Sequence, residues 1–189
     1  MRDVFITASI GGFAGFAILG LFTATAPVFM AEVLGITSRL AVGCLVGSMF
    51  ISSAAAQVVF HSIPPARGLR SGLVVLICGL ALIIVALASA EVMPLVLGAV
   101  TAGIGHGLTF KGGMTSIATR LEPHNRGAVI STFFVVLYTA LSLPVVGVGL
   151  LAELTTLRDA AIALAGLAMV LCLFSLLRLR TLQQRAAPA

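Results

Sequence analysis

Charged residues are scarce in this chain of 189 residues, where they make up only 9% of the sequence. A soluble globular domain carries about 25% charged residues, because its surface has to be hydrated. Hydrophobic residues make up 60% of this chain, and its mean hydropathy is +1.19. The shortage of charge excludes a soluble domain and predicts an integral membrane protein.

The chain also lacks the residue patterns that catalysis and metal binding require. It contains no H-E-x-x-H or G-x-S-x-G sequence and no phosphate-binding loop. Its three cysteines, Cys44, Cys78 and Cys172, lie in separate apolar runs without ligand spacing. They are interpreted as packing residues. We therefore expect no enzyme activity, no cofactor and no metal site.

Breaks between the apolar runs predict an all-α fold. The runs are about 20 residues long, which is the length that a helix needs to cross the hydrocarbon layer. They predict six transmembrane helices over residues 4–31, 39–61, 71–90, 94–117, 127–151 and 159–178. These helices form one bundle, 1–178, and a disordered basic tail is expected at 179–189.

The arginines predict the orientation of this bundle. If both termini are cytoplasmic, only Arg39 and Arg158 lie on the far side of the membrane. The cytoplasmic side then holds Arg2, Arg67, Arg70, Arg120, Arg126, Arg178, Arg180 and Arg185. This asymmetry follows the positive-inside rule. It accounts for the net charge of +5, and scattered basic residues without interleaved aromatics give no indication of nucleic-acid binding.

Three features within residues 101–153 occur in a recognisable order. Glycines alternate in the fourth predicted helix, a loop reading EPHNRG follows, and the fifth helix has spaced polar and small residues. The residues are Gly103, Gly105, Gly107, Phe110, Glu122 to Gly127, Ser131 to Phe133, Tyr138, Ser142 to Pro144, Gly147 and Gly149. This order resembles the tenth and eleventh helices of a major facilitator superfamily permease. The bacterial efflux-type members, which handle sugars or drugs, are the most similar.

The resemblance implies that the chain corresponds to the C-terminal six-helix half of a permease in a bacterial inner membrane. Such a half consists of two three-helix units of inverted topology, a 3+3 repeat. The division would fall at residues 90–93. The opening helix of the first unit contains Gly11, Gly12 and Gly15, and small residues there allow close packing between helices.

Two cytoplasmic loops carry further residues of this resemblance. The family's basic signature between the second and third helices corresponds to Arg67 and Arg70, but its leading glycine and its aspartate are absent. This departure counts against the family's gating ion pair. Arg126 and Gly127 are expected to fix the turn into the fifth helix and to contact lipid headgroups.

Lys111 is the chain's only lysine, and it lies within a predicted membrane span that contains no carboxylate. An ionisable side chain at such a depth usually faces a water-filled cavity or a partner. Lys111 shares a helical stripe with Gly107, Gly103 and Thr115. It either attracts an anionic substrate group, pairs with a carboxylate of a missing half, or extends toward the headgroups at the cytoplasmic surface.

His106 lies nearer the middle of the same helix, in a stripe with Thr109. It is either a proton-coupling group or a neutral histidine that is hydrogen-bonded to a neighbouring helix. Because Lys111 and His106 are expected to point in different directions, a shared cavity is not assumed. Thr23 and Phe16 of the first helix are weaker candidates for the cavity lining, and ordinary packing is their alternative role.

Pro144 and Gly147 predict a bend in the fifth helix, which acts as a hinge or as a static kink. A secondary permease that moves a small molecule is the expected function. One bundle alone exposes half a cavity to lipid, so the chain is expected either to be a fragment or to pair with a second six-helix unit, including a copy of itself. The alternative is a non-transporting membrane subunit, a scaffold or a decayed permease.

Overall fold

The computed structural model describes residues 2–186, without the side chains at 2–4, 123 and 182–186. These residues form six helices, and each helix is long and apolar enough to cross a membrane. They are α1 (Arg2–Glu32), α2 (Arg39–Val59), α3 (Pro65–Ser89), α4 (Val92–Ala118), α5 (Pro123–Leu154) and α6 (Leu157–Ala186). The predicted all-helical, multi-pass membrane fold is confirmed.

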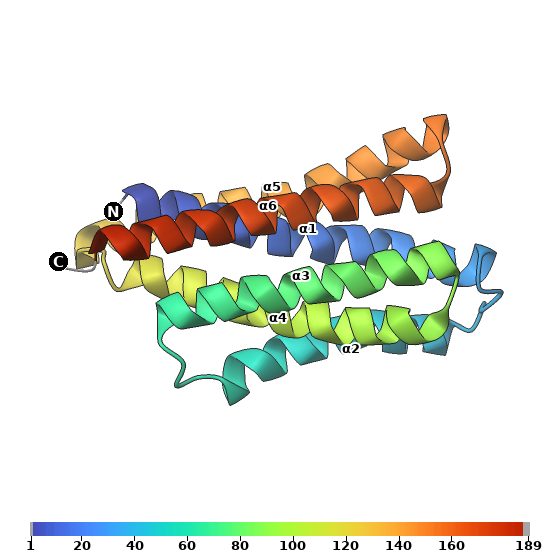
Figure 1. The fold of residues 1–189 in the computed structure, drawn as a ribbon, viewed down its shortest axis with the longest axis horizontal. Helices are drawn as coiled ribbons and strands as arrows, with labels where there is room; N and C mark the ends of the chain where they lie inside the picture. Colours follow the sequence, from blue (N-terminus) through green and yellow to red (C-terminus); the bar gives the residue numbers. More distant parts are fainter. Residues whose placement is uncertain (1, 187–189) are drawn as a thin grey trace.

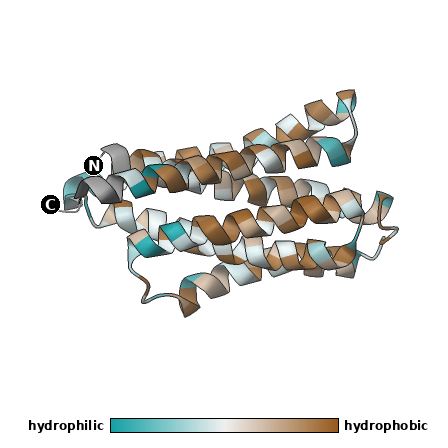
Figure 2. Ribbon diagram, in the orientation of Figure 1, coloured by the Kyte–Doolittle hydropathy of each residue, from teal (hydrophilic) through white to brown (hydrophobic). Residues whose placement is uncertain are grey.

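The helices run up and down through one bundle. Figure 1 shows both ends of the described chain at one end of the bundle, together with the α2–α3 and α4–α5 turns. The other three turns lie at the opposite end. Figure 2 shows apolar residues along the middle of the helices and hydrophilic residues gathered toward both ends, as a bilayer requires.

The first and fourth helices form the centre of the bundle. α1 packs against α4, α5 and α6, whereas α4 packs against α1, α2 and α3. α3 also packs against α6. This contact joins the helices around α1 to the helices around α4, on the side of the bundle away from α2 and α5. α1 and α4 are the most buried of the six helices, and α2 and α5 are the most exposed.

Glycine lets α4 approach its neighbours closely. A Cβ atom at Gly103 or Gly107 would overlap the backbone carbonyl oxygens of α2, and one at Gly105 would overlap the backbone of α3 at Leu76. On α1, a Cβ atom at Gly20 would overlap the carbonyl oxygen of Leu141 in α5. Helices in lipid associate by such close packing, because no hydrophobic force drives them together. The expected packing role of the alternating glycines agrees with these contacts.

Two helices begin at least four residues earlier than the sequence pattern predicted. α3 begins at Pro65 rather than at residue 71, and α5 begins at Pro123 rather than at residue 127. Proline is favoured in the first turn of a helix, where its missing N–H group is not needed. Arg67 and Arg70 therefore lie in the first turns of α3, and Arg126 and Gly127 lie in the first turn of α5. The sequence pattern predicted cytoplasmic loops for these four residues, and that prediction is wrong.

The last helix also extends further than expected. α6 continues to Ala186, through most of the segment for which the sequence predicted disorder. The segment contains leucine, arginine, glutamine and alanine, which all favour helix. The remaining residues of the predicted tail, 187–189, lie outside the described part of the chain.

Candidate functional site

Aromatic side chains from three helices form a connected row on the side of the bundle where α1, α4 and α5 meet. The Phe16 ring lies 4.9 Å from the His106 ring and 5.7 Å from the Phe110 ring, centroid to centroid. Phe110 contacts Phe134 at 6.3 Å, and Phe134 contacts Tyr138 at 6.1 Å. We refer to these five residues as the aromatic row.

Most of the aromatic row is neither fully buried nor fully exposed. Phe16, Phe110 and Phe134 are half-buried, whereas Tyr138 is 61% exposed and His106 is only 7% exposed. The row thus leads from the surface of α5 to a buried imidazole between α1, α2 and α4. Rings at these distances make stabilising contacts with one another.

His106 is held at the inner end of the row by α2. Its Nδ1 atom and the Ser53 hydroxyl lie 2.8 Å apart in a buried hydrogen bond. Gly15 of α1 leaves room for the ring, because a Cβ atom there would lie 3.2 Å from the His106 Cδ2 atom. The Nε2 atom has no hydrogen-bond partner among the described residues. The imidazole therefore has one nitrogen anchored, whereas its other nitrogen is buried without a partner among the described residues.

Lys111 also contacts α2, one turn further along α4. Its Nζ atom donates a hydrogen bond of 2.7 Å to the carbonyl oxygen of Gln57, and the Gln57 side chain donates one of 3.3 Å to the carbonyl oxygen of Ser53. Lys111 and His106 thus share a neighbouring helix, although the sequence suggested different directions. The stripe of Gly103, Gly107 and Lys111 places all three positions against α2.

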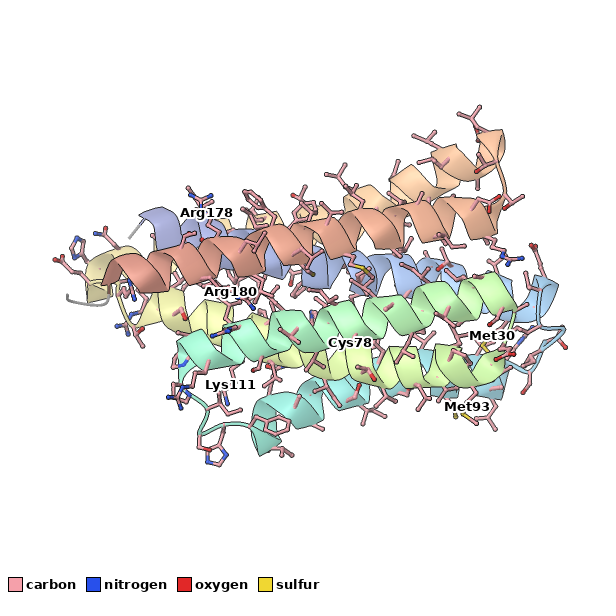
Figure 3. The ribbon with its side chains drawn as sticks, in the orientation of Figure 1. Met30, Cys78, Met93, Lys111, Arg178 and Arg180 are labelled. Carbon is pink, nitrogen blue, oxygen red and sulfur yellow. The ribbon has the colours of Figure 1, made fainter. Side chains whose placement is uncertain are left out.

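The contact of Lys111 has a simple electrostatic basis. Gln57 is in the last turn of α2, where carbonyl oxygens lack intrahelical partners and the helix dipole is negative. Figure 3 shows Lys111 toward the same end of the bundle as Arg178 and Arg180, whereas Met30 and Met93 lie at the opposite end. The ammonium group reaches neither the aromatic row nor a carboxylate in any described contact.

The predicted threonines do not gather at one site. Thr109 is buried against Gly72 of α3, and Thr115 lines a pocket beside Lys111. The Thr23 hydroxyl donates to carbonyl oxygens of its own helix, at Leu19 and Gly20. Of the predicted cavity residues, only Phe16 and His106 belong to the aromatic row.

Pro144 lies within α5, which remains one helix from end to end. It has no N–H group to donate to the carbonyl oxygen of Ala140. Gly147 faces α6, because a Cβ atom there would lie 3.8 Å from Leu164. Figure 1 shows the second part of α5 rising away from α1 toward the upper right, beyond the middle of the helix.

The exposed side of α5 carries polar groups at a depth where lipid would be expected. Tyr138 lies near the middle of this helix, and Ser131, Thr139 and Ser142 are also exposed. The hydroxyl groups of Thr139 and Ser142 donate to carbonyl oxygens of their own helix. The Tyr138 hydroxyl makes no such bond with any described residue, and an unpaired hydroxyl in hydrocarbon is costly.

The acidic side chains that the structure describes all lie at helix ends or in turns, at Glu32, Glu91, Glu122, Glu153 and Asp159. Within the same part of the chain, no three His, Cys, Asp or Glu side chains are close enough to hold a metal ion. The site is therefore built from aromatic rings, one imidazole and hydroxyl groups.

The sequence matches no protein-family model, and no curated protein matches it.

Proposed function

We propose that this chain is one six-helix half of a secondary transporter of the major facilitator type, and that it moves a small molecule across a bacterial inner membrane. The observation that carries the proposal is the aromatic row. It connects the exposed Tyr138 of α5 to the buried His106 of α4, at the centre of the bundle. At its inner end, the row reaches an imidazole whose Nε2 atom is buried without a partner among the described residues.

The pattern of helix contacts supports a repeat of two three-helix units. If α1, α2 and α3 are exchanged with α4, α5 and α6, the contacts of α1 with α5 and α6 become those of α4 with α2 and α3. The α1–α4 and α3–α6 contacts are each retained by this exchange. Inverted repeats of this kind build many secondary transporters, with substrate sites at the repeat interface near the bilayer midplane.

A second six-helix unit is the proposed cover for this face. α2 and α5 are the least buried helices, and the Tyr138 hydroxyl lies at mid-membrane depth without a described partner. A polar ligand cavity between two units would hydrate this group, whereas lipid would not. The second unit is either another part of a longer chain or a separate six-helix chain, including a copy of this one.

The residues of the site suggest how a ligand would be held. Phe16 and Phe110 would stack on a planar or apolar body, and the free Nε2 atom of His106 would donate or accept one hydrogen bond. Rocking of the two units about this site would expose it to each side of the membrane in turn. No described carboxylate lies near the row, so any coupling to a cation would require groups from the second unit.

Flux measurements test this proposal. The chain is reconstituted into liposomes, and uptake of ethidium, a planar drug, and of lactose, a sugar, is followed with and without a proton gradient. We expect flux of at least one probe, and we expect Phe16→Ala to reduce it. Phe174→Ala, which removes an exposed ring on α6, is the matched control. If the flux equals that of liposomes without protein, transport by this chain paired with a copy of itself is contradicted.

The alternative is a non-transporting subunit or scaffold. It is favoured by one observation, namely that His106 and Lys111 both use hydrogen bonds to α2 and so contribute to the packing of the bundle. A scaffold would fold normally and move neither probe. In a scaffold, Phe16→Ala would also leave the binding of ethidium and lactose unchanged.

The proposed orientation places both termini in the cytoplasm. It is supported by the clustering of arginines at the end of the bundle that carries the termini, at Arg67, Arg70, Arg120, Arg126, Arg178 and Arg180. Labelling of single introduced cysteines in intact cells tests it. In a chain whose three native cysteines are replaced by alanine, a cysteine at Thr37 should react with a membrane-impermeant maleimide, whereas one at Asn125 should react only after the cells are opened.

A further inference from the structure

A pocket of about 270 Å³ lies beneath the turn between α2 and α3. We refer to it as the α2–α3 pocket. Its walls come from the end of α2, the turn, the start of α3 and the last part of α4, and they include Phe60, His61, Ile63, Lys111 and Thr115. The volume is close to the lower end of the range for small-ligand pockets, about 300 Å³. None of the aromatic row lines it, so it is distinct from the proposed transport site.

The charge of this pocket is positive. Lys111 contributes an ammonium group with three donors, of which the bond to Gln57 uses one. None of the lining residues is acidic, and Ser62 and Thr115 add hydroxyl groups. Arg67 and Arg70 lie in the first turns of α3, whose start forms one wall. An anionic ligand with several acceptor oxygens would satisfy the free donors of Lys111.

The pocket also has an apolar side. Phe60, Ile63 and Leu108 line it, and the adjoining end of α2 exposes Val58 and Val59 at 72% and 67%. These valines lie at the end of a helix that is apolar enough to span the membrane. A polar recess next to an apolar helix surface fits the two parts of a phospholipid, namely its polar headgroup and its apolar acyl chains.

We propose that the α2–α3 pocket binds an anionic phosphate group, with Lys111 as its principal donor. Two sources carry this chemistry: the headgroup of an anionic phospholipid, with its acyl chains along Val58 and Val59, and free phosphate from the cytoplasm. This inference does not depend on transport by the aromatic row, because the pocket and the row share no residue.

Gly68 offers a way to block the pocket without removing the lysine. A Cβ atom at Gly68 would have no neighbour closer than 3.8 Å, so alanine fits there without overlap. The larger side chain of Gly68→Leu would extend into the pocket. Gly68→Ala is therefore the control for Gly68→Leu, and Lys111→Arg, which keeps the charge, is the control for Lys111→Met.

Native mass spectrometry of the delipidated chain in mild detergent tests the proposal. Phosphatidylglycerol, phosphatidylcholine and inorganic phosphate are added separately, and circular dichroism verifies that each variant is folded. We expect one molecule of phosphatidylglycerol to bind more strongly than phosphatidylcholine. Lys111→Met should weaken this binding by about fivefold, the usual effect of one lysine at an anionic surface. Gly68→Leu should abolish it, whereas both controls should retain it.

Competition identifies the source of the phosphate group. If inorganic phosphate does not displace phosphatidylglycerol, the pocket is a lipid site. If phosphate alone binds, and Lys111→Met and Gly68→Leu both remove that binding, the pocket takes free phosphate. Equal binding of both lipids with no effect of either variant, and no binding of inorganic phosphate, would overturn the proposal.

Discussion

The ammonium group of Lys111 donates a hydrogen bond of 2.7 Å to the carbonyl oxygen of Gln57, so the only lysine of the chain stabilises the C-terminal end of a neighbouring helix. A cation at this position interacts favourably with the helix dipole and with an otherwise unpaired carbonyl oxygen. The cost of a charge within the bundle is thereby reduced. The same contact fixes the distance between α2 and α4 at the end of their glycine interface.

Lys111→Met is expected to loosen the last turn of α2. Loss of a cation at a helix C-terminus costs about 0.3–1 kcal/mol, which corresponds to an increase of up to about fivefold in local opening. Hydrogen exchange of the Phe60 amide, which donates to Ala56 in this turn, reports the change. Lys111→Arg should preserve the slow exchange. Unchanged exchange in Lys111→Met would show that the contact has no stabilising role.

Gly107→Ala is expected to destabilise the whole bundle. The added Cβ atom would overlap the carbonyl oxygen of Ser53, so α2 and α4 would have to separate. Overpacking of this kind costs about 1–3 kcal/mol. Unfolding in mixed micelles measures the loss. Gly166→Ala in α6 is the matched control, because a Cβ atom there would meet nothing within 4 Å. Since alanine favours helix over glycine, this variant should unfold no more readily than the unaltered chain.

Ser53 and His106 are expected to be energetically coupled. Ser53→Ala removes the partner of a buried imidazole nitrogen, and His106→Leu removes the imidazole. Interhelical hydrogen bonds in membrane proteins contribute about 0.6 kcal/mol on average and up to about 1.7 kcal/mol. A double-mutant cycle of unfolding free energies should give a coupling energy in this range. Additive single effects would mean that the bond contributes nothing to stability.

His106→Gln separates two roles that the histidine could have in the proposed transport. Glutamine retains a hydrogen-bonding side chain near Ser53 but does not gain a proton between pH 5 and 8. If His106 couples transport to protons, the variant should keep its fold and lose the pH dependence of ethidium or lactose flux. Flux with an unaltered pH dependence would assign the histidine to ligand binding or to packing alone.

The six helices could be predicted from the sequence, because a helix that crosses the hydrocarbon layer needs a long run of residues without charge. Helix ends are harder to predict, since they depend on single residues such as Pro65 and Pro123. The alternating glycines of α4 predicted close packing between helices, but the sequence did not predict that α4 lies at the centre of the bundle. Its charge within an apolar run marks Lys111 as important, but its partner is a backbone carbonyl oxygen, which no pattern of side chains reveals.

The aromatic row was only partly predictable. Phe16 and His106 were candidates, whereas Ser53 and Phe134 were not. Nothing in the local sequence distinguishes Phe134 from Phe133, although the structure buries Phe133 completely and places Phe134 against Phe110. The difference depends on which side of α5 faces α4, and this is decided by contacts between helices that are far apart in the sequence.

The hydrogen bond from the Ser175 hydroxyl to the carbonyl oxygen of Thr7 joins residues 168 positions apart. It has a consequence for biogenesis. Of these six helices, α1 enters the membrane before the others and its partners α5 and α6 are synthesised last, so the glycine surface of α1 faces lipid until they follow. A ribosome that stalls before α6 would leave a nascent chain without its closing contact, and such a chain would be a natural substrate for membrane quality control.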